Sequence, residues 1–252
     1  MGIDASARAF PRSRLPGMFR FVVGIGGRAA DEYQAALGLH DSCTGCRSVG
    51  RAQNLPADRG LCCNTVAMMH YAKGVAHAAL GDVPAAQAEQ ALFRAAAQLV
   101  PGSRQIHNVK CVQLLAIAEA MLEGEIAYRR GEHDTAFAHL RTAVALEDDL
   151  PYDEPWGWMQ PVRHALGALL LEQGRAAEAE VAYREDLGLG GALPRAQIHP
   201  DNLWALRGLL DCLERRGETA EAALIRQRVE IATARADVPV SVSCFCAGGM
   251  AA

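Results

Sequence analysis

This chain of 252 residues lacks the features that mark several common classes of protein. It has no uninterrupted apolar stretch near the roughly 20 residues that cross a bilayer, and the run FVVGIGG at residues 21–27 is far shorter. Its formal net charge is −4, whereas nucleic-acid binders usually carry a basic face. It has no GxGxxG or GxxxxGK phosphate loop and no local signature of a Ser–His–Asp or Cys–His site. We therefore expect no membrane span, no nucleic-acid partner, no cofactor and no enzyme activity.

Acidic residues are scarce at the N-terminus, where five arginines of residues 1–28 face the single acid Asp4. This bias resembles an organelle transit peptide, but the amphipathic pattern of such peptides is faint here. We predict an irregular leader over residues 1–60, with apolar spacing over residues 28–39 that suits a capping helix. No apolar core precedes a small-residue cleavage site, so we expect a cytoplasmic protein. Organelle targeting by the arginine-rich leader is the alternative.

Glycine and alanine recur at fixed positions in the rest of the chain. Two glycines seven residues apart are followed, five residues later, by an alanine. The three complete copies are Gly74, Gly81 and Ala86; Gly124, Gly131 and Ala136; and Gly167, Gly174 and Ala179. A fourth copy keeps Gly217 and Ala222 but has Leu210 in place of the first glycine. Internal repetition of this kind indicates a repeat architecture.

Each position of the repeat has a physical role. A glycine inside a helix costs about 0.5–1 kcal/mol relative to alanine, so its recurrence indicates a close approach that a side chain would block. The second glycine suits the left-handed residue that ends a helix. The alanine then begins a return helix on its inner face. With apolar residues at helical spacing around them and no segment that suggests a strand, these copies predict an all-α fold of four antiparallel hairpins.

The hairpin pattern resembles the tetratricopeptide repeat family, whose units have 34 residues. The likeness covers about residues 64–236, although the steps here are 50, 43 and 43 residues, so we expect extra length in the helices or in loops such as PYDEPWGWMQP. DEPWGWMQPVRHALGALLLEQGR and SCFC resemble the C-terminal part of larger, mostly uncharacterised proteins of this family. The resemblance implies an α-solenoid over residues 61–238 and a tail over residues 239–252. It also implies a non-catalytic scaffold that binds a peptide or protein on its concave face.

Two tryptophans lie close to an arginine and a histidine where the third hairpin begins. Trp156, Trp158, Arg163 and His164 are our candidate partner-binding residues, since an arginine beside aromatic planes suits a carboxylate or an aromatic segment. In the alternative, which the residues favour, the tryptophans fill the gap left by the long repeat. Arg163 would then pair with Glu154 or Asp186.

One partner is disfavoured by the same comparison with the repeat family. Members that hold chaperone C-terminal tails use a clamp of Lys, Asn and Arg on successive first helices. The matching positions here are occupied by Tyr71, Val75, Leu122, Pro161 and Ala165. These side chains cannot grip a carboxylate, so we expect no chaperone-tail docking.

The eight cysteines carry the alternative function, a metal-binding or redox-linked accessory protein. Cys43 and Cys46 have the spacing of half a zinc site, but no clean second half follows. Cys244 and Cys246 in the tail could bind copper or oxidise. We predict no metal site, reduced cysteines in the tail, and core positions for Cys111 and Cys212.

Overall fold

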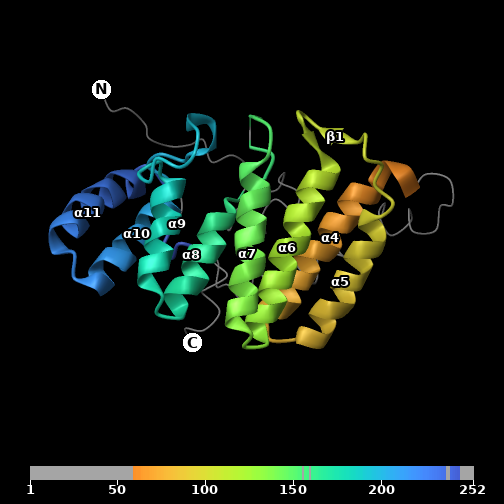
Figure 1. Ribbon diagram of the computed structural model, residues 1–252, viewed down its shortest axis with the longest axis horizontal. Coiled ribbons are helices and arrows are strands. Elements are labelled where there is room, and N and C mark those ends of the chain that lie inside the picture. The colour runs from red at the N-terminus through yellow and green to blue at the C-terminus, as the bar shows by residue number, and fades with distance from the viewer. Residues whose placement is uncertain (1–58, 155, 159, 237–238, 245–252) are drawn as a thin grey trace, which may run out of the picture.

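The computed structural model describes residues 59–154, 156–158, 160–236 and 239–244. Most of these residues lie in α-helices, which confirms the predicted all-α class. The helices are α4 (Arg59–Ala79), α5 (Val83–Ala97), α6 (Cys111–Arg129), α7 (His133–Asp148), α8 (Val162–Glu172), α9 (Ala176–Asp186), α10 (Leu203–Arg216) and α11 (Thr219–Thr233). They follow one another along the long axis of the molecule (Figure 1). The leader and its capping helix at 28–39 fall outside the described residues.

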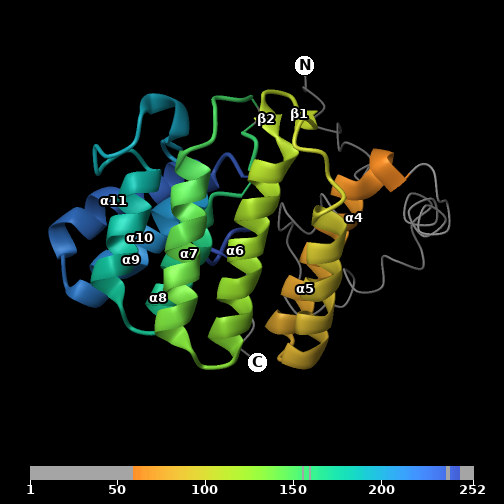
Figure 2. The same cartoon turned by 45° about the vertical axis from the view of Figure 1, so that its right-hand side comes forward.

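Consecutive helices pack in pairs: α4 with α5, α6 with α7, α8 with α9, and α10 with α11. Both views show α4 beside α5 and α6 beside α7 (Figures 1 and 2). The second glycine of each repeat lies in the turn between the two helices of a pair. Gly81, Gly131, Gly174 and Gly217 have φ values of +84°, +80°, +73° and +75°. L-residues rarely adopt this left-handed conformation, so the structure confirms the role predicted for these glycines.

The first glycine of each repeat lies where another element comes too close for a side chain. A Cβ atom at Gly74, Gly124 or Gly167 would lie 2.9, 2.9 or 2.4 Å from Leu122, Leu140 or Tyr183, respectively. The fourth copy supplies such a glycine after all, two positions before Leu210. A Cβ at Gly208 would lie 2.2 Å from the Tyr183 ring, which is therefore held between α8 and α10. The repeated alanines are buried as predicted: Ala86, Ala136, Ala179 and Ala222.

The extra length of the repeats lies in the segments that join one pair to the next. The first of these contains two short antiparallel strands, β1 (Gln105–Ile106) and β2 (Val109–Lys110). The prediction of no strand in the repeats is wrong here, because a two-residue strand is too short for its side chains to show alternation. The second segment is the 149–161 loop. The third is the 187–202 loop, which contains the 3-10 helix η1 (Arg195–Gln197).

Buried apolar residues form two large clusters along the row of helices. One lies among α4 to α7 and includes Trp158 and Val162, and the other extends from α6 and α7 to α11. Cys111 and Cys212 are buried, which confirms their predicted place in the core. No helix in the described part of the chain combines the length and the apolar character needed to cross a membrane.

Candidate binding pocket between two loops

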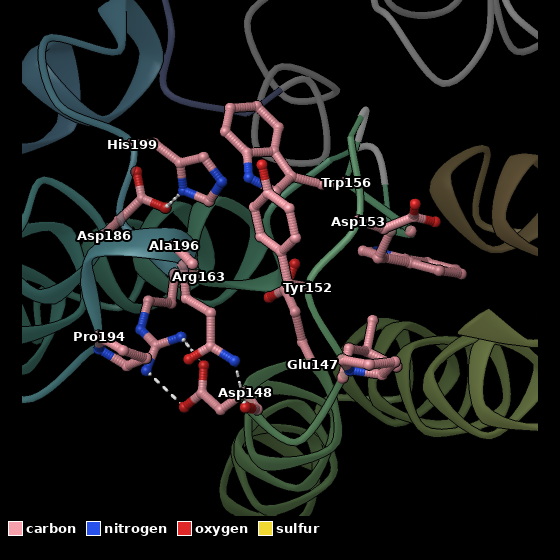
Figure 3. A pocket seen from close by; sticks show the side chains of 15 residues that line it. Glu147, Asp148, Tyr152, Asp153, Trp156, Arg163, Asp186, Pro194, Ala196 and His199 are labelled. Atoms are coloured by element: carbon pink, nitrogen blue, oxygen red, sulfur yellow. Dashed lines mark hydrogen bonds and ion pairs between the residues drawn. The ribbon is translucent and has the colours of Figure 1, made fainter. Parts of the chain in front are cut away.

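The 149–161 and 187–202 loops lie at the same end of the helices (Figure 1) and enclose a cavity of about 270 Å³, the loop pocket (Figure 3). Its walls come from the ends of α7 and α9, the start of α8, and both loops. Its side chains include Glu147, Asp148, Tyr152, Asp153, Trp156, Trp158, Arg163, Asp186, Gln197 and His199. Gln197 fixes the second loop to the end of α7, because its Nε2 donates to the Asp148 backbone carbonyl at 2.5 Å.

Arg163 closes one side of the loop pocket and is fully engaged by two acids. Its terminal nitrogens donate to both carboxylate oxygens of Asp148, at 2.6 and 2.8 Å. Its Nε and one terminal nitrogen also donate to Glu185, at 3.2 and 3.1 Å. Burial lowers the pKa of Arg163, but these bonds outweigh it and keep the guanidinium charged. The structure thus places Arg163 in a structural ion-pair group with no charge left for a ligand carboxylate.

The sequence-based pairing of Arg163 with Glu154 or Asp186 is wrong. Asp186 is only 1% exposed, and two histidines occupy its carboxylate. His164 Nε2 lies 2.9 Å from one oxygen and His199 Nδ1 lies 2.7 Å from the other. Burial raises the pKa of Asp186, and the bonds from His164 and His199 more than offset this, so the pKa lies below its usual range.

This arrangement fixes the proton positions on both rings. An ionised carboxylate can only accept hydrogen bonds, so His164 Nε2 and His199 Nδ1 both donate to Asp186. His199 lines the pocket, is 9% exposed, and its Nε2 has no hydrogen-bond partner among the described residues. In the neutral ring this second nitrogen carries a lone pair. A neutral His199 therefore offers this nitrogen to the pocket as a hydrogen-bond acceptor.

The two tryptophans of the 149–161 loop have different environments. Trp158 is 9% exposed and packs edge-on against Tyr71 of α4, with ring centroids 5.8 Å apart. Its indole Nε1 is buried without a partner in the described part of the chain. Trp156 is 44% exposed and stands edge-on to His199, with centroids 4.2 Å apart (Figure 3). Trp158 therefore contributes mainly to the core, whereas Trp156 remains open to a ligand.

Glu147, in the last turn of α7, is the most perturbed acid of the loop pocket. Its Oε2 accepts a hydrogen bond of 2.9 Å from the backbone N–H of Val162, where α8 begins. Burial raises the pKa of Glu147 to about 8, with the Val162 bond and Arg163 opposing the rise and the charges of Asp186 and Asp148 adding to it. Near neutral pH this carboxyl group holds a proton.

The four candidate residues from the sequence all lie at or next to the loop pocket, but in different roles. Arg163 and His164 are buried in ion-pair contacts, Trp158 is packed, and Trp156 alone is exposed. Sequence reasoning missed Glu147, Asp186 and His199 as members of the site. The signal in the sequence was slight: Glu147 belongs to an acid run before Pro151, and His199 precedes a proline in a long loop.

Metal binding has no counterpart in the part of the chain that the structure describes. No three His, Cys, Asp or Glu side chains are grouped there to hold a metal ion. Cys43, Cys46 and Cys246 lie outside the described residues. The prediction of a reduced tail is wrong for Cys244, which is disulfide-bonded. It is 4% exposed and packs near Ala165 and Ala168 of α8, a docked position that the tail sequence did not reveal.

Comparison with known proteins finds no matching family model, no matching curated protein and no matching solved structure. The likeness to tetratricopeptide repeats therefore rests on the spacing of glycines and alanines and stays a prediction.

Proposed function

We propose that the protein is a non-catalytic interaction module, an α-solenoid of four antiparallel, tetratricopeptide-like hairpins that binds a partner protein. Four consecutive helix pairs, each turning at a left-handed glycine, support this architecture. Neighbouring pairs also contact each other, α4 with α6 and α9 with α10, as expected when repeats stack. Repeat arrays of this kind present extended surfaces on which partners bind.

The loop pocket is the place where we propose that the partner docks. The observation that carries this is the exposed indole of Trp156 at a cavity where Arg163 is held by Asp148 and His199 by Asp186. Rigid aromatic anchors beside a preformed pocket are typical centres of binding energy in protein interfaces. The inner helix of the third pair is a poorer candidate, because Val162 to Leu171 of α8 are all buried. The end of the array with the loops is thus favoured over its concave face at this pair.

The same contacts argue against a partner that is recognised through a carboxylate. Arg163 is saturated by Asp148 and Glu185. Tyr71, Leu122 and Ala165, at the positions of the chaperone-tail clamp, are buried. A chaperone C-terminal tail therefore stays disfavoured as the partner.

The test is capture of partners from lysate by the intact protein and by matched variants. We expect Trp156→Ala to lose the captured partner while the melting temperature changes little, because an exposed side chain contributes less than about 0.5 kcal/mol to stability. Ile231→Ala, on an exposed face of α11, is the control and should retain capture. Trp158→Ala should instead lower stability by about 3–5 kcal/mol, since it empties a packed site. Undiminished capture by Trp156→Ala would refute docking at the loop pocket.

A further inference from the structure

We infer that the loop pocket binds a basic side chain, arginine or lysine, of a partner protein. This inference rests on the proposed interaction function and names the chemistry that its site selects. Charge, aromatic surface, hydrogen-bonding capacity and size each support it.

The charge of the lining favours a cation. Four acidic side chains line the cavity against the one guanidinium of Arg163: Asp148, Asp153, Asp186 and Glu147, of which Glu147 holds a proton near neutral pH. That guanidinium is shared by Asp148 and by Glu185 behind it, so this group of three has an excess of negative charge. Asp153 is 5% exposed and accepts from the backbone N–H of Glu154 at 3.1 Å and from the Asn108 side-chain amide at 3.5 Å, and its Oδ1 lies 3.9 Å from His107 Nδ1. The acids at the pocket thus outnumber its one guanidinium.

Aromatic rings provide the second part of a cation site. Tyr152 and Trp156 are both exposed residues of the 149–161 loop, and both line the pocket (Figure 3). The face of a tryptophan or tyrosine ring attracts a guanidinium or ammonium group, by about 0.5–2 kcal/mol depending on exposure. These rings can cover the aliphatic stem while the charged end enters among the acids.

Hydrogen-bond acceptors at the pocket provide the third part of a cation site. His199 holds its Nδ1–H on Asp186, which turns the lone pair of Nε2 toward the side of the ring facing Trp156 (Figure 3). Glu147 accepts the bond from Val162 through Oε2, so its other oxygen is a further acceptor once the group ionises. Arginine and lysine side chains carry only donors, so they match these acceptors, whereas the indole N–H of Trp158 in the same lining is itself a donor and pairs with neither.

Size selects a side chain over a larger ligand. Sites for drug-sized molecules and cofactors have volumes of about 300–1,000 Å³, and the loop pocket, at about 270 Å³, lies below that range. One long side chain, delivered from a partner surface, suits this volume.

The position of Glu147 makes binding depend on pH in a specific direction. The charged groups that act on it are Arg163 of α8, Asp186 of α9 and Asp148 on its own helix. Its pKa of about 8 means that near pH 7 about one molecule in ten has this carboxylate ionised. If a cation requires the ionised form, its apparent affinity should rise about tenfold from pH 7 to pH 9.

The experiment uses full-length protein and Nα-acetyl-arginine amide, whose guanidinium keeps its charge over this range. Titration is followed by calorimetry and by the indole N–H signal of Trp156 in NMR spectra, assigned through Trp156→Phe. We expect saturable binding that tightens about tenfold from pH 7 to pH 9. Nα-acetyl-lysine amide should behave alike. Nα-acetyl-citrulline amide, which has the same shape without the charge, should not bind.

Glu147→Gln separates the pocket chemistry from non-specific attraction to an acidic protein. The variant should bind the arginine probe more weakly at pH 9 and lose the pH dependence, whereas the control Glu230→Gln, exposed on α11, should retain both. Equal binding of citrulline and arginine, or an unchanged pH profile in Glu147→Gln, would overturn the inference. The probe requires no partner protein, so its failure is distinct from failure of the capture test. If the probe binds but Trp156→Ala still captures the partner, the pocket binds cations and the proposal that the partner docks there is refuted.

Discussion

The side chain of Glu147 sets a clear pH dependence for the stability of this protein. Its pKa rises from 4.5 to about 8 on folding, with burial as the largest cause. Between these values the folded state holds a proton that the unfolded state has lost. Stability contributed by this group is therefore complete below about pH 4.5 and is lost as the pH rises toward 8.

Glu147→Gln tests this directly, because glutamine can accept the same bond from Val162 but does not ionise. Each pKa unit corresponds to about 1.4 kcal/mol, so relative to wild type the variant should gain on the order of a few kcal/mol between about pH 5 and pH 8.5. Urea unfolding at several pH values, followed by circular dichroism, measures the difference. Glu230→Gln provides the baseline for an exposed glutamate. If the difference in unfolding free energy between Glu147→Gln and wild type does not change with pH, Glu147 ionises normally.

The contribution of Asp186 to stability has the opposite dependence on pH and falls in a different pH range. Burial raises its pKa, but the bonds from His164 and His199 outweigh this and hold the pKa below its usual range. The stability from this group is present above its unfolded pKa and is lost as the pH falls through the lower folded value. It therefore does not interfere with the window of Glu147.

At the scale of helices, the Tyr183 ring is the contact that binds the third pair to the fourth. Gly167 of α8 and Gly208 of α10 leave space for the ring from two sides. Adding a methyl group at either glycine forces the ring or a helix to move, because the new Cβ would lie 2.4 or 2.2 Å from ring carbon Cζ. The buried ring has no room to shift freely.

We therefore expect Gly167→Ala and Gly208→Ala each to lower the free energy of unfolding by about 1–3 kcal/mol, even though alanine favours helix formation. Gly102→Ala is the matched control, since nothing lies within 4 Å of its added Cβ. Chemical unfolding of the three variants makes the comparison. Combining Gly167→Ala with Tyr183→Leu should cost less than the sum of the single changes if the clash is with this ring. Additive losses would place the strain elsewhere.

The helices illustrate what the sequence can predict and what it cannot. Turn glycines and inner alanines repeat at fixed spacing, so local conformational preference and periodicity were enough to place them. The loop pocket depends on contacts between residues far apart in sequence, such as Trp158 with Tyr71 and Arg163 with Glu185. No period links such residues, and several acids near Arg163 were equally plausible partners. Asp186 does not pair with Arg163 because His164 and His199 occupy its carboxylate. That arrangement is visible only once the loops are packed.

At the scale of the whole molecule, the C-terminal tail returns to the centre of the row of helices. Val240 joins the cluster that includes residues of α10 and α11. Ser243 reaches further back, with its Oγ 2.6 Å from the hydroxyl of Tyr183 in α9. Gln160, in the 149–161 loop, donates to the Cys244 sulfur at 3.6 Å. The tail thus links the fourth pair, the third pair and the loop beside the pocket.

Truncation after residue 238 should therefore destabilise the row of helices well beyond α11. Burial of a valine contributes about 1.5–3 kcal/mol, and a buried hydroxyl left without its partner costs about 1–3 kcal/mol. We expect a loss on the order of 3–5 kcal/mol in urea unfolding, carried out under reducing conditions so that the Cys244 disulfide does not contribute. Ser243→Ala, which removes only the bond to Tyr183, should account for the smaller part of this loss in stability. Because the deleted segment packs on α8, hydrogen exchange in α8 should quicken in the truncated protein while exchange in α5, which lies at the far end of the row, stays unchanged. Equal unfolding midpoints for the full and truncated chains would show that the docked tail makes no net contribution to the fold.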